Sequence, residues 1–119
     1  MHELAVTEEI LRIATEYARE AKATRITAIH LVIGQMAGFV DDCIQFYFDL
    51  LTKGTLAEGA RLHFHRIPTR LRCWGCGQEF VPEDMDWRCP QCQMAGGEVV
   101  AGKEFFVESI EIERDHSEV

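Results

Sequence analysis

The sequence has little positive charge and no long hydrophobic run. Its 119 residues include 12 Lys and Arg against 20 Asp and Glu, which gives a formal net charge of −8. No stretch approaches the roughly 18 consecutive apolar residues that a transmembrane helix needs. A surface that binds nucleic acid needs clustered Lys and Arg, whereas residues 69–104 hold four basic side chains against six acidic ones. We therefore expect no membrane and no nucleic acid among the partners.

Signals for export and for catalysis are also missing. Residues 1–4 show no basic segment leading into a long apolar run, so no secretory signal is expected. The chain contains no Ser-His-Asp order, no phosphate-binding loop and no paired-carboxylate motif. Because disulfides persist in oxidising compartments, cysteines that stay reduced fit a cytoplasmic protein. These absences favour a cytoplasmic protein that is not an enzyme.

Four of the five cysteines form two Cys-x-x-Cys pairs. Cys73 and Cys76 make the first pair, and Cys89 and Cys92 the second, with 12 residues between the pairs. Each pair puts two thiolates on one turn, and two facing turns make the tetrahedral four-sulfur site of structural zinc, with Zn–S bonds of about 2.3 Å. Two disulfides would need an oxidising compartment. A redox motif would have a single Cys-x-x-Cys, and an iron–sulfur cluster usually has different cysteine spacings. Since four protein ligands leave no position for a catalytic water, we predict that this zinc holds structure.

The remaining segments predict an α+β fold: a small three-stranded sheet packed with two helices, plus an inserted zinc-ribbon domain with four cysteine ligands. Apolar residues recur at steps of three and four in the helical segments, whereas the strands are β-rich or alternate in polarity. On this basis Tyr17, Leu51 and the fifth cysteine, Cys43, are expected on buried helix faces. The predicted helices are 4–22 and 41–53, the strands are 25–33, 60–67 and 105–113, and the zinc segment is 69–104.

Taken in order, these motifs resemble the HypA/HybF family of nickel metallochaperones, which help insert nickel into [NiFe]-hydrogenase. The resemblance covers nearly the whole chain, and the combination of an opening Met-His-Glu with a late double Cys-x-x-Cys is specific. Besides the two cysteine pairs, the matching pieces are Met1-His2-Glu3, Leu31-Val-Ile-Gly34, Phe46-Tyr-Phe-Asp49, Leu51-Thr-Lys-Gly-Thr55, Glu58-Gly-Ala60 and Gly102-Lys-Glu104.

The resemblance implies two domains. Residues 1–68 and 105–119 would form a nickel-binding α+β domain, and residues 69–104 an inserted zinc-binding domain. Family members deliver nickel together with a partner GTPase of the HypB type. The acceptor is the hydrogenase large subunit, and some relatives also serve urease. The oligomeric state stays open, with a homodimer among the alternatives.

The chemistry of the first three residues agrees with this implication. Ni²⁺ favours nitrogen donors and square-planar geometry in such sites. Met1 offers its free amine, His2 an imidazole and an amide nitrogen, and Glu3 a second amide or its carboxylate. A site on a chain end is exposed, which suits a carrier that must release its metal. We therefore expect Ni²⁺ as cargo at His2, assisted by Met1 and Glu3, and Zn²⁺ as a structural ion.

Other polar residues allow competing interpretations. Glu3 could serve as a helix cap, and so could Asp41 and Asp42, which lie near an acidic position implicated in nickel binding in some relatives. His63 and His65 share one strand face, where a solvated surface is the simpler interpretation. A hydrolytic site built on this pair has no clear third ligand. His30 is expected to be a satisfied core or sheet-face residue, and His116 belongs to the tail.

The alternative function is a zinc-ribbon interaction or adaptor module with no nickel role. The acidic charge of the chain counts against its use on nucleic acid. Nickel binding that is lost with His2 would favour the carrier, whereas salt-sensitive DNA binding would favour the adaptor.

Overall fold

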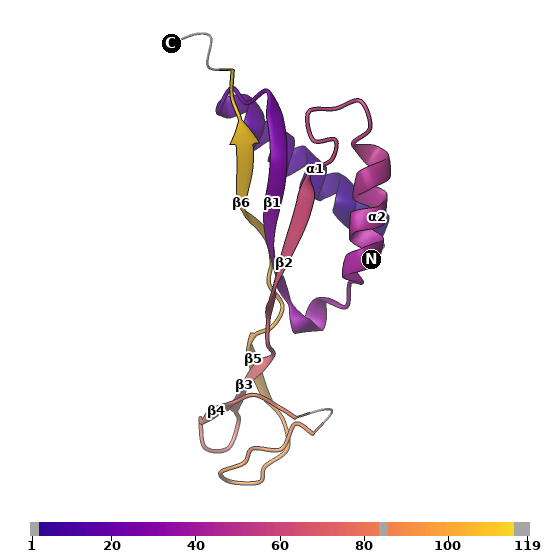
Figure 1. Ribbon diagram of the computed structural model, residues 1–119. Helices are drawn as coiled ribbons and strands as arrows, with labels where there is room; N and C mark the ends of the chain where they lie inside the picture. Colours follow the sequence, from indigo (N-terminus) through magenta and orange to yellow (C-terminus); the bar gives the residue numbers. More distant parts are fainter. Residues whose placement is uncertain (1–2, 84–85, 116–119) are drawn as a thin grey trace. The chain divides into compact units, whose positions relative to one another are not determined.

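The computed structural model describes residues 3–83 and 86–115, and it contains two helices, one short 3-10 helix and two three-stranded sheets (Figure 1). The strand orders are β2-β1-β6 in the larger sheet and β4-β3-β5 in the smaller one. The predicted fold class is therefore confirmed. In chain order the elements are α1 (Glu3–Glu20), β1 (Arg25–Gly34), η1 (Gln35–Ala37), α2 (Asp41–Leu51), β2 (Arg61–Ile67), β3 (Arg70–Cys73), β4 (Glu79–Phe80), β5 (Gly97–Ala101) and β6 (Phe105–Glu113).

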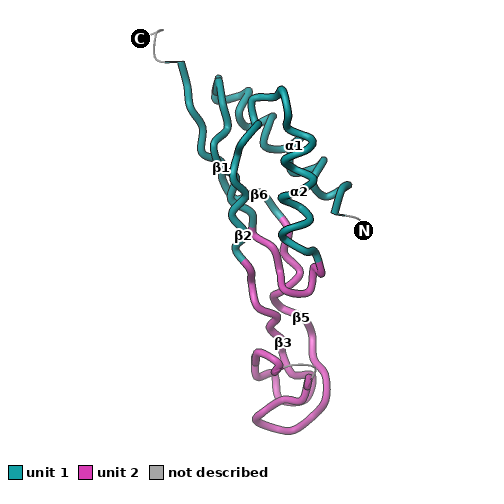
Figure 2. The backbone as a smooth tube through the Cα atoms, turned by 45° about the vertical axis from the view of Figure 1, so that its right-hand side comes forward, with its two compact units in different colours: residues 1–31, 39–65, 106–119 teal, residues 32–38, 66–105 magenta. Residues whose placement is uncertain are grey.

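The chain divides into two compact units (Figure 2). Unit 1 comprises residues 1–31, 39–65 and 106–119, and unit 2 comprises residues 32–38 and 66–105. Within unit 2, the backbone N–H of Gly34 donates to the carbonyl of Glu104 at 2.7 Å, and that of Met36 to the carbonyl of Gly102 at 2.9 Å. A Cβ on Gly34 would lie 2.0 Å from the carbonyl oxygen of Gly102, so only glycine permits this approach.

In unit 1, α1 and α2 pack against each other and lie on one side of the larger sheet (Figure 1). The inward side of α1 repeats every four residues, as an amphipathic helix requires. Ile29 and Leu31 of the central strand are fully buried as well. The buried helical residues are Val6, Thr7, Ile10, Ala14 and Ala18 on α1, and Ile44 and Phe48 on α2.

Both helices end earlier than the sequence predicts, and three side chains expected inside are exposed. After α1 the chain turns through Lys22, whose φ of 57° is left-handed and cannot continue a helix. Tyr17 is 47% exposed, because Ala18 takes the inward position of that turn. Cys43 precedes the buried Ile44 and points to solvent instead. The expectations of burial for Tyr17, Cys43 and Leu51, which is 36% exposed, were wrong.

The cysteine-bearing segment of unit 2, residues 66–105, has a very small core. Strand β3 pairs antiparallel with β4 and β5, so that Leu71 lies opposite Phe80 on one side and Val99 on the other. Cys73 and Cys89 complete the buried cluster, and Trp87 packs against it. So few apolar side chains give little hydrophobic stabilisation, and small domains of this kind depend on a metal or another cross-link.

Candidate metal centre

The two Cys-x-x-Cys turns have the same local geometry. The N–H of Gly75 donates to Sγ of Cys73 at 3.3 Å, and the N–H of Gln91 donates to Sγ of Cys89 at 3.4 Å. Each turn is closed by a backbone bond from the fourth residue after its first cysteine, to Cys73 at 3.0 Å and to Cys89 at 2.9 Å. The donors, Gly77 and Gln93, have positive φ values of 76° and 67°. The same backbone turn therefore occurs twice.

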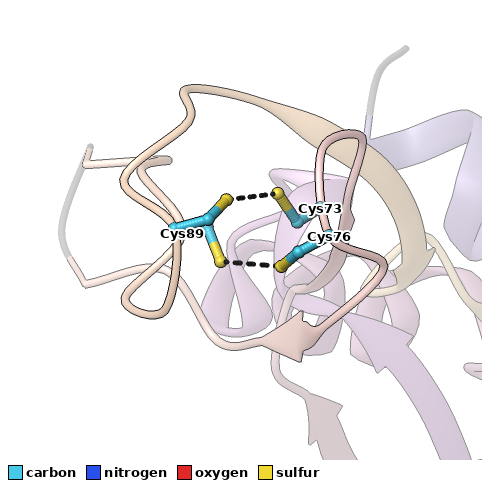
Figure 3. A group of neighbouring side chains, drawn as sticks. Cys73, Cys76 and Cys89 are labelled. Atoms are coloured by element: carbon cyan, nitrogen blue, oxygen red, sulfur yellow. Dashed lines mark hydrogen bonds between the residues drawn. The ribbon is translucent and has the colours of Figure 1, made fainter.

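Together these turns bring four sulfurs to one place (Figure 3). Sγ of Cys73 lies 3.4 Å from that of Cys92, and Sγ of Cys76 lies 3.6 Å from that of Cys89. All four lie within 4.8 Å of one another. A tetrahedral four-sulfur zinc centre with bonds of about 2.3 Å has sulfur–sulfur edges of about 3.8 Å. The donor set and its spacing therefore fit structural zinc.

The thiol groups of this cluster differ in acidity. Hydrogen bonds from the backbone N–H groups of Cys76 and Gly75 lower the pKa of Cys73 to about 6. At Cys92 the N–H of Met94 acts in the same direction, but the hydrogen bond with Cys73 and burial outweigh it and raise the pKa to about 12. Four adjacent thiols cannot all lose their protons without a cation. A divalent metal ion supplies that positive charge, which is why it can replace the protons.

At the N-terminus, the predicted ligands Met1 and His2 lie outside the described residues. Glu3 opens α1, and its carboxylate accepts a hydrogen bond of 3.3 Å from the N–H of Val40, the residue before α2. Asp41 and Asp42 follow in the first turn of α2. The start of α1 and the start of α2 therefore lie next to each other, although they are about forty positions apart in the chain. This brings the carboxylate of Glu3 near the helix turn that carries Asp41 and Asp42.

A second group of possible ligands lies on the larger sheet. His30 on β1 contacts His65 of β2 and Glu111 of β6, with Nδ1 3.1 Å from Nε2 of His65 and Nε2 2.7 Å from Oε2 of Glu111. His63 stacks on the ring of His30 with centroids 4.7 Å apart. The sequence alone provided the His63–His65 pair and the expectation that His30 is satisfied. It missed Glu111, because only the strand order brings β6 beside His30.

One remaining candidate that the structure describes joins neither cluster. Cys43 is exposed on α2 and is absent from the described groups of metal-ligating side chains. His116 lies outside the described residues. Among the residues that are described, neither α-helix is sufficiently long and apolar to cross a bilayer.

Comparisons with known proteins give one consistent result. The sequence model described as "Hydrogenase/urease nickel incorporation, metallochaperone, hypA" matches residues 1–112. A hydrogenase maturation factor HypA from Dehalococcoides mccartyi is 49% identical over 113 residues, which is 95% of each chain. A factor of the same name from Geobacter sulfurreducens is 39% identical over 113 residues, covering 95% of this chain and all of that one.

Solved structures agree on the fold. The solution structure of the Ni metallochaperone HypA from Helicobacter pylori is similar with a TM-score of 0.66 and 21% identity, over 97% of this chain and 100% of that one. A second solution structure, of a HypA protein, gives a TM-score of 0.72 at 21% identity, over 97% and 98% of the two chains.

Proposed function

The chain belongs to the HypA family of hydrogenase and urease nickel-incorporation metallochaperones, and from this premise we propose that it binds Ni²⁺ at its N-terminus and delivers it during maturation of [NiFe]-hydrogenase. The observation that carries the proposal is the family match, which runs from residue 1 to residue 112 and so includes the Met-His-Glu start. In this proposal nickel is cargo and not a resident cofactor.

The first three residues provide suitable ligands for this cargo. The amine of Met1, the imidazole and amide of His2 and the amide of Glu3 make up to four nitrogen donors, the set that square-planar Ni²⁺ prefers. The bond from Val40 to Glu3 is consistent with a site beside the start of α2, since it holds the first turn of α1 there. Release then occurs by ligand exchange, in which stronger ligands of the acceptor replace these nitrogens one at a time.

In the same proposal, Cys73, Cys76, Cys89 and Cys92 hold Zn²⁺ and stabilise the zinc-binding domain, residues 69–104. The zinc cross-links two turns around a core that is too small to be stable alone. Four sulfur ligands leave no open position on the ion, so zinc contributes no catalysis. Residues 1–68 and 105–119 form the nickel-binding domain.

We infer a cytoplasmic protein that is not an enzyme and that works with a nickel-handling GTPase of the HypB type. The acceptor is the hydrogenase large subunit, since the similar proteins named above are hydrogenase maturation factors. Neither nucleic acid nor membrane enters this scheme.

A metal titration tests the proposal. Tag-free protein with its native N-terminus is loaded with one zinc and titrated with Ni²⁺, beside the variant His2→Ala. The proposal predicts that His2→Ala weakens the N-terminal site by at least tenfold while its zinc content stays at one per chain. If His2→Ala binds Ni²⁺ with the stoichiometry and affinity of the parent, the N-terminal site is refuted. A chain that binds zinc but no Ni²⁺ supports the adaptor function instead.

A further inference from the structure

Three strands of the larger sheet bring together four polar side chains, of which sequence patterns connect only His63 and His65. The order β2-β1-β6 places His30 between His63 and His65 on one neighbour and Glu111 on the other. His30 alternates along its strand with the fully buried Ile29 and Leu31, so its ring points to the opposite side of the sheet from theirs. The His30 side chain is 24% exposed and that of Glu111 is 61% exposed, so solvent reaches the group.

The hydrogen bonds fix the tautomer of a neutral His30. The Glu111 carboxylate, 2.7 Å from Nε2, can only accept, so the ring proton is on Nε2. Nδ1 then accepts a hydrogen bond from Nε2–H of His65 across 3.1 Å. This leaves the Glu111 carboxylate, the Nε2 position of His30 and the adjacent ring of His63 side by side at the surface.

We propose that His30, His63 and Glu111 form a third, open binding site for a divalent transition metal ion, with Ni²⁺ and Zn²⁺ as the ions that the donors suit. One ligand atom from each of the three residues lies within 4.8 Å of the others. Imidazole nitrogen suits Ni²⁺ and Zn²⁺, and a carboxylate oxygen completes a set of two histidines and one acid. The site does not depend on the N-terminal residues.

Only small movements are needed to form this site. Ligand atoms bound to one ion at about 2.0–2.1 Å lie about 3.3 Å apart in a tetrahedral arrangement. Glu111 Oε2, now 2.7 Å from Nε2 of His30, must move slightly away to admit the ion, and the ring nitrogen of His63, within 4.8 Å of the other ligand atoms, must lie at a similar spacing. Rotation of the exposed side chains of His63 and Glu111 provides both movements while the strand backbone stays in place. The rings of His63 and His30, now parallel within 13°, must tilt so that their nitrogens converge.

His65 supports the site through His30 and not as a ligand. When the metal binds Nε2 of His30, the ring proton moves to Nδ1, which donates to Nε2 of His65 over the existing contact. His65 then carries its own proton on Nδ1, so two neutral rings exchange tautomers with no net loss of protons. A hydrogen bond from the second nitrogen of a ligating histidine fixes its orientation and raises its basicity.

Three protein ligands leave at least one coordination position for water, in contrast to the four-sulfur site. An incoming ligand can attack that position, so the metal exchanges without unfolding the sheet. The inferred site is therefore a labile one, suited to holding an ion that is passed on.

The test uses a background in which the N-terminal site is impaired. Zinc-loaded, tag-free His2→Ala protein is titrated calorimetrically with Ni²⁺, alone and with His63→Ala or Glu111→Gln added. Both substituted residues are exposed, so neither change is expected to prevent folding. We expect one Ni²⁺ per chain in the background protein and an affinity at least tenfold lower in either double variant. Glu113→Gln is the matched control, because it removes an exposed acid two residues further along β6 and should leave the affinity unchanged.

The outcomes separate this site from the N-terminal one. If the wild-type chain binds Ni²⁺ and the His2→Ala background binds none, the sheet site is refuted and the N-terminal proposal stands. If His2→Ala binds Ni²⁺ as the wild type does and His63→Ala removes it, the sheet site stands and the N-terminal proposal fails. An unchanged Ni²⁺ affinity in both double variants, equal to that of the His2→Ala background, refutes the sheet site. Saturation with diamagnetic Zn²⁺ gives an independent readout, since ¹⁵N shifts should report the His30 proton on Nδ1; a proton that stays on Nε2 contradicts the assignment.

Discussion

Replacing Cys89 with serine is expected to release zinc and to unfold unit 2 locally. Cys89 is fully buried, and its sulfur lies 3.6 Å from that of Cys76. Zinc binding by comparable four-ligand peptides is worth about 10–16 kcal/mol near neutral pH, or about 3 kcal/mol for each ligand. Losing about 3 kcal/mol corresponds to a zinc affinity roughly 100-fold lower. The serine also leaves a polar group among the few buried side chains of this unit.

The assay measures zinc retained against a competing chelator, together with amide hydrogen exchange. The N–H of Cys73, bonded to the carbonyl of Gln78 at 2.9 Å, reports on unit 2. The N–H of Ile26, bonded to Leu56 at 2.8 Å, reports on unit 1 and should stay protected. Cys43→Ser is the matched control, because Cys43 is exposed on α2 and outside the cluster. Zinc retention by Cys89→Ser equal to that of the parent, or zinc loss in Cys43→Ser, would refute the account.

Further predictions concern packing and pH. Gly34→Ala should lower the free energy of unfolding by about 1–3 kcal/mol or more, because its Cβ would meet the Gly102 carbonyl oxygen at 2.0 Å; denaturant unfolding measures this, and an unchanged midpoint would contradict the close approach. Phe48→Ala should lower the free energy of unfolding by about 3–5 kcal/mol, because it leaves a cavity in the core of unit 1. The zinc content should stay unchanged, and loss of zinc from this variant would contradict the expectation that packing in unit 1 and zinc binding are independent. Apparent zinc affinity should fall with falling pH because protons compete for the thiolates. Hydrogen bonds lower the pKa of Cys73 to about 6, so its thiolate is available to zinc above that pH and is protonated below it. A chelator titration should therefore show zinc affinity falling more steeply below about pH 6 than above it. A zinc affinity that does not change with pH would contradict this prediction.

The sequence predicted the parts of the fold that depend on local patterns. The spacing of apolar residues located both helices, and the paired turns around Cys73 and Cys89 followed from their spacing alone. Helix ends and individual exposures were predicted less accurately, because they depend on which residue of a turn faces the neighbouring helix. Ala18 faces inward where Tyr17 was expected, since a small side chain permits close packing there.

The sheet cluster could not be predicted, because it depends on strand order. His30 and Glu111 are 81 positions apart and bond only because β6 pairs beside β1. Strand β5, Gly97–Ala101, is another element that local pattern did not predict. It pairs with β3 next to the cysteine turns, where register depends on the folded site.

Nickel incorporation into hydrogenase is the measurement that tests the central claim most directly. In cells that lack their own protein of this family, the wild-type chain and the variant His2→Ala are supplied in turn, and nickel bound to the hydrogenase large subunit is counted. Both chains must carry one zinc, which establishes that they are folded. The account predicts nickel incorporation with the wild type and a loss of most of it with His2→Ala. Equal incorporation with the two chains would contradict delivery from the N-terminal site.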